Sequence, residues 1–443
     1  MIIKRIESNG GKLEQNQLTV INNFFMSNFI INGGRKLKGV IDVSGMKNAA
    51  TPIIASTLLT DDECILENVP RLTDVMRLLQ ILESLGARVV WKDDHTVSVC
   101  AKGVSLKSLD RKLVKTMRSS VLLLGPMLAR FKEIDLPEPG GCIIGNRPLG
   151  THLYALERLG AEVRVKSDSY ELRASELSGA VIILPEFSVT ATENALMASS
   201  LAKGETIIKL AAMEPHVLDL IAFLNKMGAD IKEIGTHTLK IKGQKRLFGA
   251  RHKIIPDQIE IGTFAVAAAV THGEVEIKNI IPDHLDIILL QLQRIGVKFE
   301  LDKKSLLIKP SANLQAFKLQ AMPYPGFPTD LQAPFGVLAT QCRGTSLIHD
   351  PLYEGRLGYI NELQKMGANA VVCDPHRVLV TGPTPLYGQE IKSLDLRAGA
   401  TMVIAGLAAE GETRLSGAEI LDRGYESLDE RLRGLGADIE REV

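Results

Sequence analysis

The phrase LESLGA at residues 82–87 returns as LERLGA at 156–161, LNKMGA at 224–229, LQRIGV at 292–297, LQKMGA at 363–368 and LRGLGA at 432–437. The fifth residue of every copy is a glycine, which we call the shared glycine. A leucine lies four residues before it and an apolar residue directly before it. The shared glycines lie 68–74 residues apart. A fixed period of this length indicates a repeated structural unit, and the chain holds six copies.

Each copy predicts the end of a helix followed by a strand. The apolar residues at 75, 78, 79, 82 and 85 follow helical spacing, as do those at 285, 288, 289, 292 and 295. The glycine ends the helix, because a left-handed backbone is favourable only without a Cβ atom. Segments 87–90 and 161–165 then alternate in the manner of strands.

Every unit also contains a second kind of helix, rich in Ala, Gly, Ser and Thr and poor in charge. Examples are residues 48–59, 192–202, 262–271 and 397–408. A helix that is apolar nearly all round is buried, so these helices are expected at the centre of a domain. Segment 272–277 reads as the strand that follows one of them.

These units predict an α/β fold of two domains that face each other. One unit of about 70 residues is too small for a strong core, whereas three units around their small-residue helices make a domain of ordinary size. The basic stretch 244–253 is a candidate boundary. The alternative at this point is one long α/β sheet.

Composition restricts the class of protein. The 443 residues carry 52 Lys+Arg and 52 Asp+Glu with no long basic run, which argues against nucleic-acid binding. No apolar run approaches the roughly 20 residues that span a bilayer, and residues 1–30 read as a poorly ordered leader. The five cysteines are odd in number and lack a C-x-x-C pair, so reduced thiols in the cytoplasm are expected; they are Cys64, Cys100, Cys142, Cys342 and Cys373.

Familiar phosphate-loop, dinucleotide, zinc-protease and hydrolase motifs are absent, and no metal or cofactor is expected. The loop around Cys142 is rich in glycine and proline and places the thiol five residues before Arg147. A nearby cation stabilises a thiolate, so Cys142 is a candidate proton donor and acceptor. An inert buried cysteine is the alternative.

Two further breaks hold candidate residues. Lys47 and Asn48 begin a small-residue helix after Gly45, where an anion would be attracted, although a frayed surface lysine also fits. Asp330 follows a Pro- and Gly-rich turn and is either a base or a helix cap.

Arginines stand at or just before several predicted helices. Arg356, Arg397 and Arg423 occupy similar places in successive units, and Arg118 fits the same pattern in the first half. Arginine matches carboxylate and phosphate geometry, although surface ion pairs are the more frequent role. Together these residues predict transfer chemistry on a small, multiply anionic substrate.

At this point the chain resembles a known family, the enolpyruvyl transferases, and within it the branch that uses UDP-N-acetylglucosamine. The resemblance spans about residues 31–442 and rests on ordered phrases at residues 45–50, 123–131, 140–145, 325–330, 395–398 and 422–426. The resemblance implies two inside-out α/β barrel-like domains with the active site in the cleft between them. Residues 31–46 and 255–443 would form one domain, and 47–254 the other, which carries the Cys142 loop.

The implied reaction transfers the enolpyruvyl group of phosphoenolpyruvate to the sugar 3′-hydroxyl and releases phosphate. By resemblance, Cys142 is the acid, Asp330 the base, and Lys47 and Arg397 complete the catalytic set. Substrate contacts are further implied for Asn48, Arg118, Arg147, Pro148, Leu149, Gly150, Thr151, Ser188, Val189, Leu352, Arg356 and Arg423. A monomer or weak homo-oligomer is expected, taking part in peptidoglycan synthesis.

Some residues depart from the family pattern on the uridine side. The phrase after Arg147-Pro148 usually contains an acidic residue, whereas here it reads Leu149-Gly150-Thr151-His152. Glu186 and Thr190 replace residues that are often basic and glycine, respectively. Glu354-Gly355 likewise replaces an Asn or Asp before Arg356. A shifted acceptor sugar is therefore one alternative, the shikimate-pathway transferase is a second, and a non-catalytic regulator that binds nucleotide sugar is a third.

Overall fold

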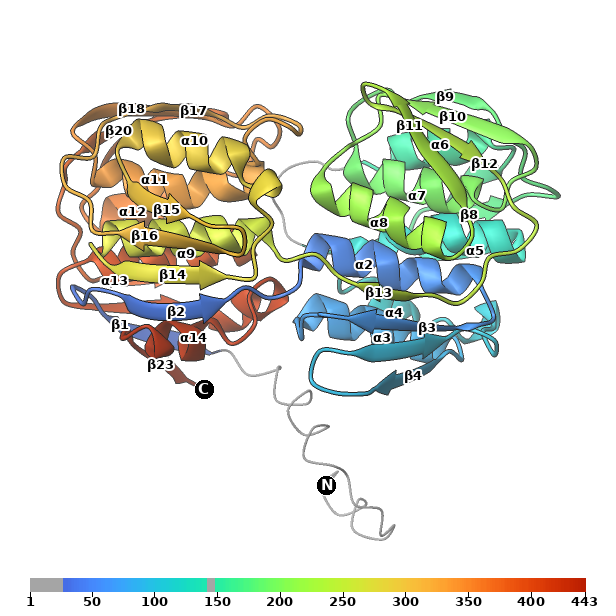
Figure 1. The fold of residues 1–443 in the computed structure, drawn as a ribbon, viewed down its shortest axis with the longest axis horizontal. Coiled ribbons are helices and arrows are strands. Elements are labelled where there is room, and N and C mark those ends of the chain that lie inside the picture. The colour runs from blue at the N-terminus through green and yellow to red at the C-terminus, as the bar shows by residue number, and fades with distance from the viewer. Residues whose placement is uncertain (1–26, 142–147) are drawn as a thin grey trace, which may run out of the picture.

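The computed structural model describes residues 27–141 and 148–443, which form two lobes side by side (Figure 1). The first lobe contains β1 (Asn28–Asn32), β2 (Lys38–Asp42) and everything from α9 (Gln258–Val270) to β23 (Asp438–Glu442). The second lobe runs from α2 (Lys47–Ser56) to β13 (Arg251–Lys253). The chain therefore passes from the first lobe to the second and back again.

The strands form small separate sheets. In the first lobe their orders are β21-β22-β1-β23, β15-β16-β14-β2 and β17-β18-β20-β19. Their remaining members are β14 (Glu274–Lys278), β15 (Lys298–Leu301), β16 (Ser305–Lys309), β17 (Lys318–Gln320), β18 (Gly344–His349), β19 (Asn369–Asp374), β20 (Arg377–Gly382), β21 (Glu390–Lys392) and β22 (Glu412–Ser416).

In the second lobe the orders are β13-β3-β5-β4, β11-β12-β10-β9 and β6-β8-β7. The members are β3 (Glu63–Glu67), β4 (Arg88–Trp91), β5 (Val97–Cys100), β6 (Glu133–Pro137), β7 (Glu162–Val165), β8 (Ser169–Arg173), β9 (Val181–Ile183), β10 (Glu205–Lys209), β11 (Asp230–Gly235) and β12 (Thr238–Lys242). The alternative of one long α/β sheet is wrong, because the strands of the described residues are divided among separate sheets of three or four strands each.

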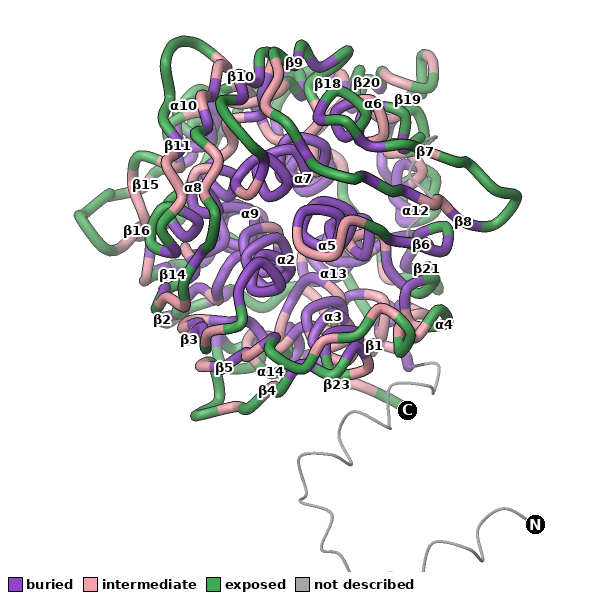
Figure 2. Tube along the Cα trace, turned by 90° about the vertical axis from the view of Figure 1, so that its right-hand side faces the viewer, coloured by how far each residue is buried: buried purple, intermediate pink, exposed green. Residues whose placement is uncertain are grey.

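Helices lie inside the ring of sheets. The second lobe is built around α2, α5 (Leu124–Phe131) and α7 (Val189–Ser199), which are buried at its centre (Figure 2). The first lobe is built around α9, α11 (Gln332–Thr340) and α13 (Leu396–Ala408), which contact one another. Every residue of α9 is buried. The predicted small-residue helices at the centre of each domain are thus confirmed, as is the two-domain α/β fold.

The six recurring phrases end a second set of helices, as the sequence predicts. These are α3 (Thr73–Ser84), α6 (Gly150–Arg158), α8 (Pro215–Lys226), α10 (Asp286–Ile295), α12 (Tyr359–Lys365) and α14 (Leu428–Gly434). Each shared glycine has a φ between 90° and 101°. The remaining short helices are α4 (Arg111–Val114), η3 (Thr57–Leu59), η4 (Leu106–Ser108), η5 (Arg118–Leu123), η6 (Pro282–His284), η7 (Thr329–Leu331) and η8 (Ala418–Arg423).

The N-terminal strands complete sheets built from the C-terminal half. β1 lies between β22 and β23, antiparallel to both, and β2 runs parallel to β14. The expectation of a poorly ordered leader is therefore wrong for residues 28–30, because Phe29 and Ile31 of β1 are fully buried. Residues 1–26 lie outside the described part. The exact domain boundaries, 46/47 and 254/255, stay a prediction.

Candidate active site

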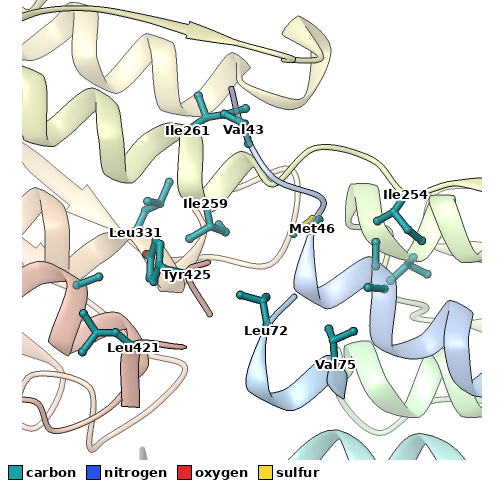
Figure 3. Packing of buried hydrophobic residues seen from close by; sticks show 14 of the residues in the cluster. Val43, Met46, Leu72, Val75, Ile254, Ile259, Ile261, Leu331, Leu421 and Tyr425 are labelled. Carbon is teal, nitrogen blue, oxygen red and sulfur yellow. The ribbon is translucent and has the colours of Figure 1, made fainter. Parts of the chain in front are cut away.

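The two connections between the lobes run side by side, and we call this place the junction. The Met46 amide donates to the Ile255 carbonyl at 2.8 Å, and the Asp257 amide donates to the Ser44 carbonyl at 3.0 Å. Apolar side chains cover both sides, with Ile259 and Leu331 on the first lobe and Leu72 on the second (Figure 3). Residues beside the junction are therefore held in place by two lobes at once.

On the first lobe, Asp330 lies between two arginines. Its Oδ1 is 2.6 Å from Arg356 Nη1, and its Oδ2 is 3.1 Å from Arg397 Nε. Burial alone would raise the pKa of Asp330, but the two guanidinium groups hold it far below its usual range. The carboxylate oxygens are used by these arginines, so the alternative of a helix-capping aspartate is wrong.

Neighbouring elements fix this cluster. Leu331 packs against α9 so closely that a Cβ atom at Gly262 would lie 2.5 Å from it. The side chain of Asp395 accepts the amides of Arg397 and Ala398 and so caps α13. Among the described residues, Arg356 Nε and Arg397 Nη1 are buried without a hydrogen-bond partner, which leaves two charged donors for an incoming anion.

Across the junction, Lys47 and Arg423 share one carboxylate. Lys47 Nζ lies 2.6 Å from Asp74 Oδ2, and Arg423 Nε lies 3.0 Å from Asp74 Oδ1. Burial opposes ionisation of Asp74, yet the charges of Lys47 and Arg423 lower its pKa below the ordinary value. Lys47 is buried and paired, so a frayed surface lysine is excluded.

The two cation clusters are linked through the junction. The guanidinium carbon of Arg397 lies 5.2 Å from the centre of the Tyr425 ring, two residues after Arg423. Asp257 acts electrostatically on Arg397, and burial raises the pKa of Asp257 to about 6. Arg356, Arg397, Arg423 and Lys47 therefore gather around the junction, as predicted, with Asp330 and Asp74 as their counter-ions.

Most of the predicted uridine-side residues form a group in the second lobe, whereas Leu352 lies in the first lobe between β18 and α12. Leu149 precedes α6, whose first turn contains Gly150 and Thr151, and Ser188 and Val189 begin α7. Thr151 Oγ1 donates to Glu186 Oε1 at 2.7 Å, and His152 Nε2 lies 2.8 Å from Thr190 Oγ1. Glu186 and Thr190, two positions that depart from the family pattern, thus each contact the first turn of α6.

Three further predicted residues lie on other elements. Arg118 begins η5 beside Gly141, where a Cβ atom would come within 2.9 Å of the arginine Cβ. The charge of Arg118 adds to burial in lowering the pKa of His152 to about 3. Asn48 is half-buried in α2 and Leu352 is exposed beside Asp350. Pro148 is exposed, whereas Cys142 and Arg147 lie outside the described residues.

Three buried titratable groups of the second lobe were missed by sequence reasoning. Glu193 of α7, and Glu214 and His216 at the start of α8, each keep one side-chain atom without a hydrogen-bond partner among the described residues. Burial, followed by the charge of Glu214, raises the pKa of Glu193, and burial raises that of Glu214. Burial lowers the pKa of His216 to about 4, against the opposing effect of Asp330. The phrase Glu214-Pro215-His216 was the available signal, but it reads as an ordinary helix start.

A separate cavity of about 420 Å³ lies at the other end of α2 from Lys47 and is lined by Asp61, Arg130 and Arg246, among others. Arg130 donates to the carbonyls of Leu58 and Thr60 there. Its charge is used to satisfy carbonyls at a helix end, so this cavity is a less convincing reaction site than the junction.

Comparisons with known proteins agree that the chain is similar to 1-carboxyvinyltransferases. The family described as EPSP synthase (3-phosphoshikimate 1-carboxyvinyltransferase) matches residues 31–432. The chain is 43% identical to a UDP-N-acetylglucosamine 1-carboxyvinyltransferase of Koribacter versatilis, covering 94% of this chain and 96% of the relative. It is 42% identical to the protein of the same name in Borreliella burgdorferi, covering 94% and 99%, respectively.

Solved structures agree on the fold. The enolpyruvyl transferase NikO from Streptomyces tendae matches with a TM-score of 0.86 at 26% identity, over 94% of this chain and 99% of that one. An EPSP synthase from Acinetobacter baumannii matches with a TM-score of 0.73 at 19% identity, over 95% and 100%. The second likeness concerns the fold alone.

Proposed function

Because the chain belongs to the family of UDP-N-acetylglucosamine 1-carboxyvinyltransferases, we propose that it transfers the enolpyruvyl group of phosphoenolpyruvate to the 3′-hydroxyl of UDP-N-acetylglucosamine. The main support is the 43% identity that extends over 94% of the chain. The reaction would release phosphate and commit the sugar to peptidoglycan synthesis, and hence to cell-wall growth, cell shape and division.

The four cations at the junction suit the charge of phosphoenolpyruvate. Its phosphate and carboxylate would bind Lys47, Arg356, Arg397 and Arg423, with Arg147 added from the loop outside the described residues. Cations that are already fixed stabilise developing negative charge without reorganising during the reaction. The buried donors on Arg356 and Arg397 that lack a partner among the described residues are available for this purpose.

Proton transfers would divide between a thiol and a carboxylate. Cys142 would protonate the methylene carbon, which makes C2 electrophilic, while Asp330 accepts the proton of the attacking hydroxyl. The new C–O bond forms at C2. Loss of a proton from the methyl carbon and of phosphate from C2 then restores the double bond.

Asp330 is a poor base while both arginines hold it. Binding of the substrate carboxylate and phosphate to Arg356 and Arg397 would weaken those ion pairs and raise the proton affinity of Asp330. Hydroxyl activation would therefore follow phosphoenolpyruvate binding, when the anion occupies the arginines.

The acceptor would bind beside the second lobe. Residues 148–151, with Ser188, Val189 and Leu352, are the proposed uridine-side contacts, and Asn48 and Arg118 would lie near the sugar. The Thr151–Glu186 and His152–Thr190 contacts fix the start of α6 against the start of α7. Because Glu186 and Thr190 depart from the family pattern, an enolpyruvyl transferase with a shifted acceptor sugar is the second candidate function.

A phosphate-release assay with each acceptor tests the proposal. Turnover with phosphoenolpyruvate is expected with UDP-N-acetylglucosamine and not with shikimate 3-phosphate. Turnover with the shikimate acceptor alone would contradict the proposal, and binding of nucleotide sugar without turnover would indicate a regulator.

The acid assignment has its own test. Cys142→Ser should lose most turnover, whereas the matched Cys373→Ser should keep it, because Cys373 is exposed on β19 away from the junction. Equal activity of the two variants would remove Cys142 from the mechanism.

We also propose a cytoplasmic location and a monomer or weak homo-oligomer. The described cysteines, Cys64, Cys100, Cys342 and Cys373, are free thiols, which suits a reducing compartment. Along the described ranges, none of the helices has the length and apolar character required to cross a bilayer.

A further inference from the structure

Asp74 connects the two lobes through its ion pairs with Lys47 and Arg423. It stands in the first turn of α3, is 1% exposed, and contacts Lys47 of its own lobe at 2.6 Å. Its other partner, Arg423, belongs to the first lobe and reaches it through Nε at 3.0 Å and Nη2 at 3.4 Å. One carboxylate therefore sets the separation of two cations that come from different lobes.

This arrangement gives Asp74 two opposing effects on an anionic substrate. The carboxylate is ionised, because the charges of Lys47 and Arg423 outweigh its burial, so it neutralises part of their attraction for an anion. It also fixes both cations, which without it would be buried charges free to adopt other positions.

A second contact on the same segment is independent of the cations. Glu426 accepts the Arg71 amide at 3.0 Å, and its other oxygen lies 2.9 Å from His95 Nε2. Residues 423–426 of the first lobe are thus attached to the second at two points. Only the Asp74 point touches the residues proposed to bind phosphoenolpyruvate.

We propose that Asp74 is a positioning residue for enolpyruvyl transfer, which holds Lys47 and Arg423 across the junction at the spacing that one phosphoryl group can bridge. The inference rests on the proposed function for its substrate. Asp74 competes with the phosphoryl group for the same two cations, so it weakens binding of free phosphoenolpyruvate while raising the rate of the bound complex.

The test separates these two effects with Asp74→Asn, which removes the charge but keeps the size. Turnover (kcat) is expected to fall by about tenfold or more, because the cations lose their fixed separation. The Kd for phosphoenolpyruvate, measured by calorimetry, is expected to fall by about threefold, because the competing charge is gone. A purely structural residue would not produce slower turnover together with tighter binding.

Asp429→Asn is the matched control. Asp429 also stands in the first turn of a helix, α14, and pairs with two arginines, Arg433 at 3.4 Å and Arg441 at 3.5 Å, but all three belong to the first lobe. This variant should leave kcat and Kd within about twofold of the parent, whatever it does to the melting temperature.

A second variant keeps the test decisive where Asp74→Asn does not fold. Asp74→Glu retains the charge and shifts it by one methylene, so kcat should fall without tighter phosphoenolpyruvate binding. Unchanged kcat in either variant, or weaker binding that tracks a loss of folded protein, would overturn the proposal.

Two further measurements distinguish failure of the role of Asp74 from failure of the proposed function. Calorimetry with phosphoenolpyruvate or inorganic phosphate, and small-angle scattering of the unliganded protein, require no turnover. Asp74→Asn is expected to increase the radius of gyration, since one of the two attachments of residues 423–426 is weakened. An unchanged radius together with unchanged anion binding would overturn the role of Asp74 even if the parent proves active on another acceptor.

Discussion

At the scale of single residues, the site is a set of buried charges that neutralise one another until substrate arrives. Asp330 and Asp74 each pair with two cations, and both carboxyl groups have lowered pKa values despite their burial. A buried carboxylate without a partner would be costly, so each of these carboxylates depends on its two cations to stay ionised. The resting site is therefore pre-organised for anions rather than for neutral ligands.

Asp330→Asn tests the base directly. The amide cannot accept the hydroxyl proton, so kcat should fall by about 10²- to 10⁴-fold. Phosphate release under saturating substrates measures it, and circular dichroism confirms that the variant is folded. Activity within about tenfold of the parent would mean that another group takes the proton.

His216 predicts a particular pH dependence of stability. Buried His216 stays neutral down to about pH 4, whereas an exposed imidazole takes up a proton near pH 6.5. Between those values the unfolded chain binds more protons, so the free energy of unfolding falls as the pH falls.

His216→Gln should remove that contribution. Between pH 7 and pH 5 the variant should lose about 2 kcal/mol less stability than the parent, as followed by denaturant titration at each pH. Parallel stability curves for the two proteins would show that His216 is not the neutral buried group described here.

Sequence reasoning found the residues that stand beside a break in a regular pattern or at a marked helix start. Lys47, Asp330 and Arg356 stand beside glycine or proline breaks and Arg397 begins a predicted helix. All four gather at the junction. Asp74 was missed because Thr73-Asp74 reads as an ordinary acidic helix start, and its partner Arg423 lies 349 residues away. A contact between lobes leaves no local signal on either partner.

At the scale of elements, small side chains let each lobe place its helices inside its sheets. Gly336 of α11 shows how close this packing is, because a Cβ atom there would lie 2.3 Å from the hydroxyl of the fully buried Tyr359. The low charge and small residues of these helices made their burial predictable. Which atoms meet could not be predicted, since every unit offers several similar small residues.

Gly336→Ala should destabilise the protein by about 1–3 kcal/mol, because the added methyl group overpacks a site that Tyr359 cannot leave. Urea unfolding measures the change. The control is Gly434→Ala in α14, where no atom lies within 4 Å of the new methyl group and the helix gains by about 0.4–1 kcal/mol. Equal effects at the two positions would contradict the packing argument.

At the scale of the whole molecule, the six repeats close into two self-contained halves. No sheet mixes strands of the two lobes in the described ranges, although β1 and β2 come from the start of the chain and pair with strands of its second half. The repeat period predicted two domains of three units each. The way the N-terminal strands return to the second half came only with the resemblance, because strand pairing over such separations has no periodic signal.

This closure predicts that residues 47–254 fold without the rest of the chain. All strands of their three sheets lie within that segment, and α2, α5 and α7 supply its buried centre. The excised fragment should show a single cooperative thermal transition and dispersed amide resonances, but no enolpyruvyl transfer, because Asp330, Arg356, Arg397 and Arg423 are missing. A fragment with helical circular dichroism but no cooperative transition would show that the second lobe needs contacts such as Asp74–Arg423 and Glu426–His95 for its packing, and the predicted boundaries would then be wrong.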